Sequence, residues 1–477
     1  MIASLRLTDA AVRFGGTLFN PEPNLASNLG TEFDSVSIDS RKTEHGDLFV
    51  ALIGERLDAH DYLYQVADKA SGLVVSKVDI QLPLAQWVVE DTTVALGQLA
   101  QLQREKFTGT VVAVTGSTGK TSVKELIASI LGQLGSVHFT KGNFNNHIGV
   151  PLTLLSMEND ADFAVIEMGA SGGGEIGYLC EIAQPHIALI NNVQLAHIEG
   201  FGSIEGIAAA KGEIYSGLQE SGIAVLNIDQ SWADQWRDLI GNRECITFSV
   251  NNSAADISAA NIEILDNGCC RFDLKVAVGT QTALSNQTAL STKEAVGTQM
   301  ITLSIPGHHS VSNALAAAAC AAAAGANLEQ IAAGLEMAAS PARRLEIKTL
   351  PSGGVIIDDS YNASPSSVRA AINVLASSAG RKVMVLGNMA ELGADEEQLH
   401  QQVGEYAVKS GIDALYTLGN LSAFASSAFN GQHFEDLDLL KLALIEEGKS
   451  SDLTILIKGS RSSQMDLVVD MLLAENS

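Results

Sequence analysis

The sequence predicts an α/β protein of three domains: an N-terminal α/β module (residues 1–106), a central domain on a parallel sheet (107–340) and a C-terminal Rossmann-like domain (341–477). Three observations predict this fold class. The chain has 477 residues, against a usual domain size of roughly 150. Its composition, with 46% hydrophobic and 5% aromatic residues, is typical of α/β proteins rich in small aliphatic side chains. Short apolar runs alternate with helix-length segments, as in parallel sheets.

The N-terminal module is predicted from residues 36–90, where apolar runs such as 48–53 and 72–75 alternate with polar turns. Residues 93–106 have the pattern of a helix, and residues 111–114 that of a buried strand. We therefore place the first domain boundary near Phe107.

The central domain continues with apolar strands at 163–166, 187–190 and 223–226. Residues 277–297 are rich in Thr, Ser, Gln and Ala without a core pattern, so we expect an exposed loop or hairpin insertion there. The Ala-rich run 314–325 is too short for a membrane span and predicts a packed helix.

The C-terminal domain begins after the stop signal Ser340-Pro341. Four strand-then-helix repeats follow, with strands at 355–357, 383–386, 414–418 and 454–457. This repetition predicts a Rossmann-like domain.

Charge and cysteine usage exclude several classes of protein. With 29 basic and 55 acidic residues the net charge is −26, which disfavours nucleic acid and anionic membrane as partners, so an anionic ligand needs a local site. Five cysteines without CxxC spacing fit a reducing compartment and no zinc site. The N-terminus has no signal-peptide pattern. We expect a cytoplasmic monomer without membrane insertion.

A phosphate-binding loop follows the strand at 111–114. It consists of Gly116, Ser117, Thr118, Gly119, Lys120, Thr121 and Ser122 and leads into a helix with one apolar face. Such a loop aims backbone amides at phosphates, Lys120 reaches the terminal phosphates of ATP, and the Thr121 hydroxyl binds Mg²⁺. Val114 stands where the common pattern has its first glycine. A glycine turn without nucleotide is the alternative, but strand, loop and helix together favour ATP.

Two further side chains are candidate metal ligands. Glu167 ends the strand at 163–166, at the sheet edge where ligands collect. His197 lies in the polar loop after the strand at 187–190. From the sequence alone, its side chain is as compatible with a structural hydrogen bond as with binding a metal. Lys211, taken alone, reads as an exposed helical lysine.

Ordered motifs along nearly the whole chain resemble the Mur ligases, which build the peptide of bacterial cell-wall precursors. The motifs are 39–41 (Asp-Ser-Arg), 46–52, the phosphate loop, 142–151, 167–170 (Glu-Met-Gly-Ala), 210–213 (Ala-Lys-Gly-Glu), 306–309 with Asn313, 344–346, 358–365, 386–393 and 458–461 (Lys-Gly-Ser-Arg). The resemblance implies three domains. The N-terminal domain binds the UDP end of the substrate, the central domain binds ATP, and the C-terminal domain closes over the site. It also implies that a substrate carboxylate is phosphorylated by ATP to an acyl phosphate, which an amine then attacks.

The resemblance also implies residue roles. The Mg²⁺ on the ATP phosphates is assigned to Thr121 and Glu167, and a second metal site to His197 and a carbamylated Lys211. Lys120, Glu167, His197 and Lys211 thereby form the catalytic set. Further nucleotide contacts are assigned to Asn313 (adenine), Arg344 and Asp359. Substrate contacts are assigned to Ser37, Asp39, Ser40 and Arg41 at the UDP end and to Asn143, Asn145, Asn146 and Asn362.

Within the family the chain is most similar to the ligases that add D-alanyl-D-alanine to UDP-N-acetylmuramoyl-tripeptide, whose third residue is diaminopimelate or lysine. The alternative is the preceding ligase, which adds that third residue and usually carries an Asp-Asn-Pro-Arg motif, absent here. A folylpolyglutamate synthetase would lack the N-terminal module, and a non-catalytic nucleotide-binding regulator would have lost catalytic residues that this chain retains. The chain departs from the family at Ala59, Ser364 and Asn388; because Asn388 replaces a carboxylate, we assign it no catalytic role.

Overall fold

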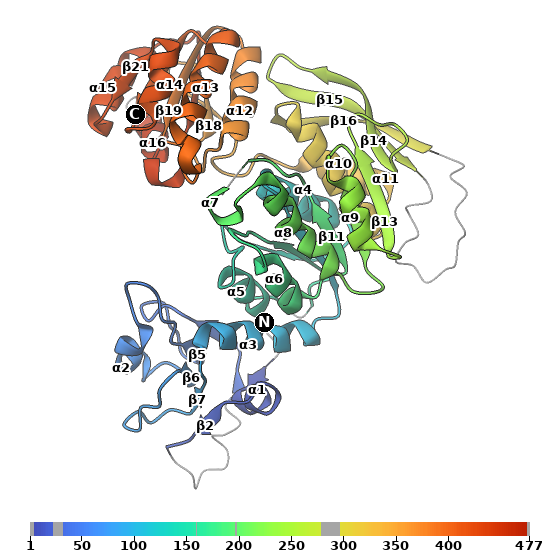
Figure 1. Ribbon diagram of the computed structural model, residues 1–477, viewed down its shortest axis with the longest axis vertical. Helices are drawn as coiled ribbons and strands as arrows, with labels where there is room; N and C mark the ends of the chain where they lie inside the picture. The colour runs from blue at the N-terminus through green and yellow to red at the C-terminus, as the bar shows by residue number, and fades with distance from the viewer. Residues whose placement is uncertain (1–3, 22–31, 159, 196–197, 278–295, 475–477) are drawn as a thin grey trace.

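The computed structural model describes residues 4–21, 32–158, 160–195, 198–277 and 296–474. Its elements gather around three main sheets, which follow one another along the long axis of the molecule in chain order (Figure 1). Among these residues, no helix combines the length and the apolar character that crossing a membrane requires.

The N-terminal sheet has five strands in the order β2-β7-β6-β5-β4, parallel except for β2. Their bounds are β2 Thr17–Phe19, β4 Ser35–Ser37, β5 Asp47–Val50, β6 Gly72–Val75 and β7 Gln86–Val88. The accompanying elements are β1 (Leu5–Arg6), which pairs with β3 (Glu32–Phe33), and helices α1 (Leu7–Phe14), η1 (Ala59–Tyr62) and α2 (Leu63–Val66).

Helix α3 (Thr92–Lys106) joins this sheet to the central one and confirms the helix predicted at 93–106. The Asp91 carboxylate caps its first turn by accepting the N–H groups of Thr93 and Val94. Its buried alanines and leucines belong to a hydrophobic core shared by the N-terminal and central sheets. Arg104 anchors the far end, donating to the carbonyls of Ala183 (2.7 Å) and Gln184 (2.8 Å).

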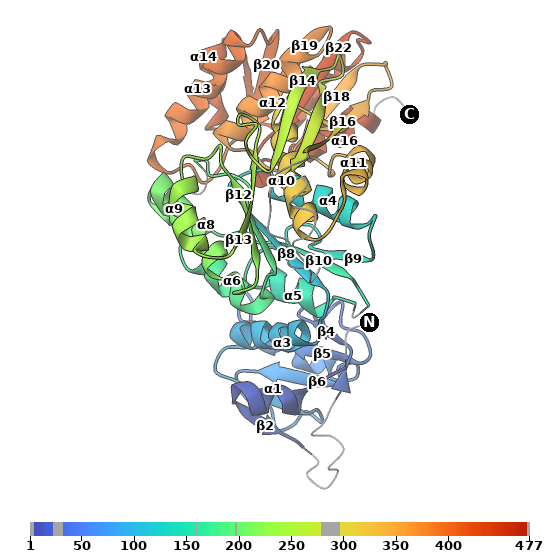
Figure 2. The ribbon, with the colours of Figure 1, turned by 90° about the vertical axis from the view of Figure 1, so that its right-hand side faces the viewer.

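The central sheet has nine strands in the order β16-β15-β14-β13-β12-β11-β8-β10-β9 (Figure 2). The four predicted strands are β8 (Thr110–Thr115), β10 (Phe163–Glu167), β11 (Ile187–Ile190) and β12 (Ile223–Asn227), and β9 (Val137–Phe139) and β13 (Glu244–Ser249) extend them in parallel. One face packs on α5 (Gly149–Leu155), α6 (Glu175–Ala183), α8 (Ile204–Ser216) and α9 (Ala233–Ile240). The other face packs on α4 (Lys120–Leu131), α10 (His309–Ala323) and α11 (Leu328–Met337). Helix α10 is the predicted Ala-rich packed helix.

An antiparallel extension of this sheet was not predicted. It comprises β14 (Ile257–Ile264), β15 (Cys269–Ala277) and β16 (Val296–Pro306). The segment predicted as an insertion at 277–297 overlaps the ends of β15 and β16, where Ala277 pairs with Val296, and its residues 278–295 lie outside the described residues. Buried Phe272, Leu274 and Val276 alternate with less buried polar residues, so the two-residue period of a strand was present in the sequence.

The C-terminal sheet has the order β17-β18-β22-β19-β20-β21 and is parallel except for β17. The four predicted strands are β18 (Val355–Asp359), β19 (Arg381–Gly387), β20 (Ala414–Leu418) and β22 (Leu453–Lys458), and β17 (Glu346–Thr349) and β21 (Gln432–Phe434) form the edges. Helices α12 (Pro365–Ser377), α13 (Glu396–Lys409) and α14 (Ser422–Phe429) cover one face; α15 (Leu437–Gly448) and α16 (Asp466–Ala474) cover the other. Short helices η3 (Gly393–Asp395) and η4 (Arg461–Ser463) lie in its loops.

Candidate active site

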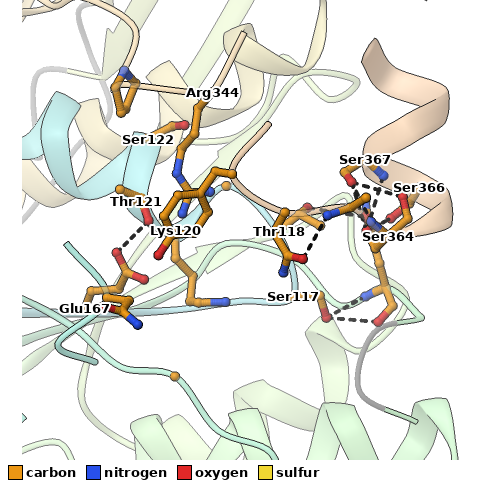
Figure 3. A pocket seen from close by; sticks show the side chains of 18 of the residues that line it. Ser117, Thr118, Lys120, Thr121, Ser122, Glu167, Arg344, Ser364, Ser366 and Ser367 are labelled. Carbon is orange, nitrogen blue, oxygen red and sulfur yellow. Dashed lines mark hydrogen bonds between the residues drawn. The ribbon is translucent and has the colours of Figure 1, made fainter. Parts of the chain in front are cut away.

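A cavity of about 1430 Å³ lies between the phosphate loop and the C-terminal sheet. Its central wall includes residues 117–122, 142, 143, 145, 146, 167 and 313. Its C-terminal wall includes residues 341–345, 359, 361–364, 390–392, 458 and 460–462, of which Arg344 and Ser364 are labelled in Figure 3. The volume exceeds the ~300–1,000 Å³ of a pocket for one small ligand, so the cavity has room for more than one reactant.

The phosphate loop is shaped by its glycines and by asparagines behind it. Gly119 has a φ of 76°, and an added Cβ would lie 2.7 Å from both Asn191 Nδ2 and Asn313 Oδ1, so any other residue would strain the backbone and displace these side chains. The Asn192 Oδ1 atom accepts the Thr118 N–H at 3.0 Å, and Asn191 Nδ2 donates to the Thr118 carbonyl at 3.0 Å. The roles of Asn191 and Asn192 were missed in the sequence, although both directly follow β11 at the ligand-binding edge.

Lys120 is the first residue of α4, and its Nζ donates to the Gly116 carbonyl at 2.7 Å. The Lys120 side chain therefore folds back over the loop that is predicted to bind the phosphates of ATP. Burial lowers its pKa, the charge of Glu167 opposes this effect, and Arg344 from the C-terminal wall adds to it. A nearby anion would relieve the cost of this buried positive charge.

Thr121 and Glu167, predicted as metal ligands, lie together. The Thr121 hydroxyl donates to Glu167 Oε2 at 2.8 Å (Figure 3), and Asn145 Nδ2 donates to Oε1 at 2.7 Å. Thr121 and Glu167 are both buried. Adjacent ligand oxygens on an octahedral Mg²⁺ stand about 2.9 Å apart, and Mg²⁺ prefers oxygen ligands, so this pair fits the ion.

The C-terminal wall carries a buried ion pair between Asp359 and Lys458, with Oδ2 and Nζ 2.5 Å apart. The ammonium also donates to the Asn362 carbonyl at 2.8 Å, and Asp359 Oδ1 accepts the Leu345 N–H at 3.2 Å. Burial raises the pKa of Asp359, and the charge of Lys458 opposes this effect. Sequence reasoning assigned Lys458 no role, although a lysine ending a buried strand at a ligand-binding edge was a usable signal.

Arg344 projects into the cavity from the segment that links the central and C-terminal sheets (Figure 3). Its guanidinium lies over the Tyr361 ring, 4.1 Å from the centroid. Arg343 and Leu345 on either side have φ values of 62° and 52°, which are unfavourable for non-glycine residues. A 2.8 Å ion pair between Arg343 and Asp466 holds this segment against α16.

Most predicted site residues meet at the cavity. Those on its lining are Ser117, Thr118, Gly119, Lys120, Thr121, Ser122, Asn143, Asn145, Asn146, Glu167, Asn313, Arg344, Asp359 and Asn362. His197 lies outside the described residues. Asn388 is not on the lining; its Oδ1 accepts the N–H groups of Leu421 (3.1 Å) and Ser422 (2.9 Å) at the start of α14, a structural role.

The residues predicted for the UDP end form a separate group at the end of β4 and in the turn after it. The Arg41 guanidinium donates to both carboxylate oxygens of Asp39 at 2.8 Å, and these bonds lower the pKa of Asp39 to about 2. The Ser37 hydroxyl donates to the Asp39 carbonyl at 3.2 Å. Ser37, Asp39, Ser40 and Arg41 are not on the cavity lining.

Lys211 lies on α8 and is 3% exposed, so its reading as an exposed helical lysine is wrong. Its Nζ lies 5.7 Å from the centroid of the Phe201 ring. Burial, together with the charge of Lys120, lowers the pKa of Lys211 to about 7. The neighbouring Glu213 carboxylate instead accepts the N–H groups of Gly174 (2.7 Å) and Gly177 (2.9 Å).

The phosphate loop lies on a parallel sheet and faces, across one cavity, a charged wall from a second sheet. This arrangement defines the class of P-loop proteins whose nucleotide site is completed by another part of the chain. Two family models match the chain, the Mur ligase middle domain over residues 114–321 and the "Mur ligase, glutamate ligase domain" over residues 343–461. The chain belongs to the Mur ligase family.

Similar proteins span nearly the whole chain. The UDP-N-acetylmuramoyl-tripeptide--D-alanyl-D-alanine ligase of Escherichia coli K12 is 45% identical over 92% of this chain and 93% of its own length. A crystal structure of MurF from Acinetobacter baumannii has a TM-score of 0.88 and 33% identity, covering 99% of this chain and 100% of that one. MurF ligase from Thermotoga maritima in complex with ADP has a TM-score of 0.78 and 26% identity, covering 92% and 97%.

Proposed function

We propose that this protein uses ATP to join D-alanyl-D-alanine to the tripeptide carboxylate of UDP-N-acetylmuramoyl-tripeptide, giving the pentapeptide precursor of peptidoglycan. The observation that supports this proposal most strongly is that the phosphate loop with Lys120, the Thr121–Glu167 pair and the C-terminal wall all line the same cavity. Its volume suits reactants that must be present together. We further propose that the enzyme acts as a cytoplasmic monomer with three domains, 1–106, 107–340 and 341–477, each containing one of the main sheets.

The reaction has two steps. A carboxylate oxygen of the tripeptide bonds to the γ-phosphorus of ATP while the bond to the β-phosphate oxygen breaks, giving an acyl phosphate and ADP. The dipeptide amine, after losing a proton, then bonds to the acyl carbon, and inorganic phosphate leaves with the electrons of the C–O bond. Lys120 neutralises charge on the transferred phosphoryl group, and closure of the C-terminal domain over the site, which the family resemblance implies, would keep water from the acyl phosphate.

Thr121 and Glu167 would hold Mg²⁺ through their adjacent, buried oxygens. The ion would supply positive charge to the ATP phosphates. Asn145 positions the Glu167 carboxylate through its 2.7 Å hydrogen bond. Asn313, Arg344 and Asp359 would contact the nucleotide from the central and C-terminal walls.

We propose that a carbamylated Lys211 and His197 serve a second Mg²⁺. The support is the buried amine with a pKa of about 7, because its neutral form near neutral pH can add CO₂ and become an anionic oxygen donor. Residue 197 directly precedes α7 (Ile198–Phe201), whose Phe201 ring packs against the Lys211 ammonium.

UDP-N-acetylmuramoyl-tripeptide contacts two further groups of residues in this proposal. We propose that Ser37, Asp39, Ser40 and Arg41 bind the UDP end of this substrate. We propose that Asn143, Asn145, Asn146 and Asn362 contact its peptide.

Phosphate release tests the proposed function. The enzyme is mixed with ATP, Mg²⁺ and UDP-N-acetylmuramoyl-tripeptide, with D-alanyl-D-alanine or with no amine, and separately with ATP, Mg²⁺ and the UDP-dipeptide precursor, with diaminopimelate or lysine. Phosphate, ADP and pentapeptide are expected in equal amounts in the mixture with UDP-N-acetylmuramoyl-tripeptide and D-alanyl-D-alanine, and in no other mixture. Equal release without any amine, or ligation of diaminopimelate or lysine to the UDP-dipeptide precursor, would contradict the proposal.

A further inference from the structure

Thr140, directly after β9, fastens the end of β10 at Glu167. Thr140 is buried, and its N–H donates to the Val165 carbonyl at 3.1 Å, continuing the pairing of β9 with β10. Strand β9 ends at Phe139, and beyond it the Glu167 N–H donates to the Thr140 hydroxyl at 3.0 Å. The hydroxyl therefore takes the place of the next strand carbonyl and fixes the backbone of the residue that we assign to Mg²⁺.

Lys124 holds Thr140 from helix α4, which packs against β9 and β10 (Figure 2). Its Nζ donates to the Thr140 carbonyl at 2.6 Å, pairs with Glu125 at 2.8 Å and lies 5.2 Å from the centroid of the Phe139 ring. Lys124 follows Lys120 by one turn of the helix and lies on the cavity lining. Its side chain is only 1% exposed, however, and its ammonium is engaged, so Lys124 acts on the site through Thr140.

The loop that starts at Thr140 returns to Glu167 through Asn145. The Asn145 side chain donates to Glu167 Oε1 at 2.7 Å, and its carbonyl accepts the Gly169 N–H at 2.8 Å. An added Cβ at Gly169 would lie 2.9 Å from Asn145 Oδ1, so the loop lies close against the chain after β10. The loop and the end of β10 are thus fastened to each other at both ends of the loop, and a displacement of Thr140 moves both.

We propose that Lys124 and Thr140 are positioning residues, which hold Glu167 in place for Mg²⁺ and Asn145 in place for the peptide of UDP-N-acetylmuramoyl-tripeptide. The inference rests on the proposed function. Without the Thr140 hydroxyl, the buried Glu167 N–H loses its acceptor, and the end of β10 must shift to satisfy it. Removing a group that orients a metal ligand typically changes metal affinity or activity by about 10–100-fold.

Three variants of the full-length enzyme test the hydroxyl. Thr140→Val removes the acceptor and keeps the shape, whereas Thr140→Ser keeps the acceptor. Thr417→Val is the matched control, because Thr417 is also buried, its hydroxyl is 2.9 Å from His433 Nδ1, and it is not on the cavity lining. Thr140→Val is expected to raise the free Mg²⁺ concentration for half-maximal ligation about tenfold or more. Thr140→Ser and Thr417→Val should stay within about twofold of wild type.

The kinetic constants separate positioning from loss of folded enzyme. In Thr140→Val the KM for UDP-N-acetylmuramoyl-tripeptide should rise about threefold or more, and the KM for D-alanyl-D-alanine should stay within about twofold of wild type. At saturating Mg²⁺ the kcat should recover to within about threefold of wild type, because the lost interaction acts on binding. A variant that had only lost folded enzyme would show a lower kcat with every other constant unchanged.

Nucleotide binding without turnover gives a second measurement. AMP-PNP, an ATP analogue that is not hydrolysed, is titrated into each protein by calorimetry with Mg²⁺ and with EDTA. The gain in affinity that Mg²⁺ gives wild type should fall about tenfold in Thr140→Val and persist in Thr140→Ser.

Lys124→Met tests the helix side of the same connection. It should raise the Mg²⁺ requirement in the same direction as Thr140→Val. Because Lys124 acts through Thr140, the double variant should need no more Mg²⁺ than the more affected single variant. Lys124→Met is also expected to be less stable than wild type, so the Thr140 variants, which keep the lysine, decide the proposal independently.

The outcomes separate this inference from the proposed function. A Thr140→Val protein with the Mg²⁺ requirement and the AMP-PNP affinities of wild type would overturn the positioning role alone. An equal rise in the Mg²⁺ requirement of Thr417→Val, or a fall in kcat without any other change in Thr140→Val, would also overturn it. A wild type that makes no pentapeptide would overturn the proposed function, and the AMP-PNP titrations would still decide whether Thr140 positions Glu167.

Discussion

Replacing Lys211 by methionine is expected to stabilise the metal-free protein while abolishing ligation. Lys211 is 3% exposed, and no carboxylate or carbonyl of the described residues pairs with its ammonium. Its pKa falls from 10.5 to about 7 because burial penalises the charged form. That drop corresponds to roughly 5 kcal/mol of unfolding free energy lost at pH 6, where the lysine is protonated in both states. Methionine fills similar space without a charge.

The pH dependence has a definite sign. Between pH 7 and 10.5 the unfolded lysine holds a proton that the folded lysine has released, so wild-type stability rises with pH relative to the variant. The advantage of methionine should therefore shrink to roughly 2 kcal/mol at pH 9.

Urea unfolding at pH 6 and pH 9, in buffers without Mg²⁺ or bicarbonate, measures this advantage. Lys124→Met is the matched control, because Lys124 is 1% exposed but pairs with Glu125 at 2.8 Å and donates to the Thr140 carbonyl at 2.6 Å. Its replacement should destabilise the protein. A Lys211→Met protein no more stable than wild type at pH 6, or an advantage that persists unchanged at pH 9, would refute this reasoning.

Four further outcomes are expected. Lys120→Ala should keep its fold and lose about 10²–10³-fold in turnover, since its charge acts on phosphates; retention of more than about a tenth of wild-type turnover would contradict its role. Glu167→Gln should lose a similar factor and need more Mg²⁺, and a normal Mg²⁺ titration would exclude it as a ligand. Arg104→Met should lower the unfolding free energy by about 2–4 kcal/mol, since two of its charged hydrogen bonds are to the buried carbonyls of Ala183 and Phe107, without changing any KM. In calorimetry, D-alanyl-D-alanine should give no detectable heat with nucleotide-free enzyme, because ATP binds first and the dipeptide last; tight binding there would contradict the order.

The features predicted correctly from the sequence are those encoded locally. The phosphate loop and the start of α4 depend on consecutive residues, and the parallel strands are continuous apolar runs. The edge strands β17 and β21 were missed because half-exposed strands contain too few apolar residues to stand out from loops, and the extension β14–β16 was missed although β15 shows the alternation of a strand.

The site was predictable where a motif names its residues and not where tertiary packing selects them. Lys458 pairs with Asp359 only because β22 lies next to β18 in space, 99 residues along the chain. The burial of Lys211 depends on which side of α8 meets the sheet, which its small neighbours Ala210 and Gly212 do not decide. The role proposed for Lys211 came from the family resemblance and not from its sequence pattern.

The most direct test of the central claim follows one oxygen atom. UDP-N-acetylmuramoyl-tripeptide labelled with ¹⁸O in its terminal carboxylate is incubated with the enzyme, ATP, Mg²⁺ and D-alanyl-D-alanine, and the released phosphate is analysed by mass spectrometry. Attack of the carboxylate on ATP transfers one labelled oxygen to each phosphate, in equal amount to the pentapeptide formed. Unlabelled phosphate accompanying pentapeptide would show that no acyl phosphate forms and would contradict the account.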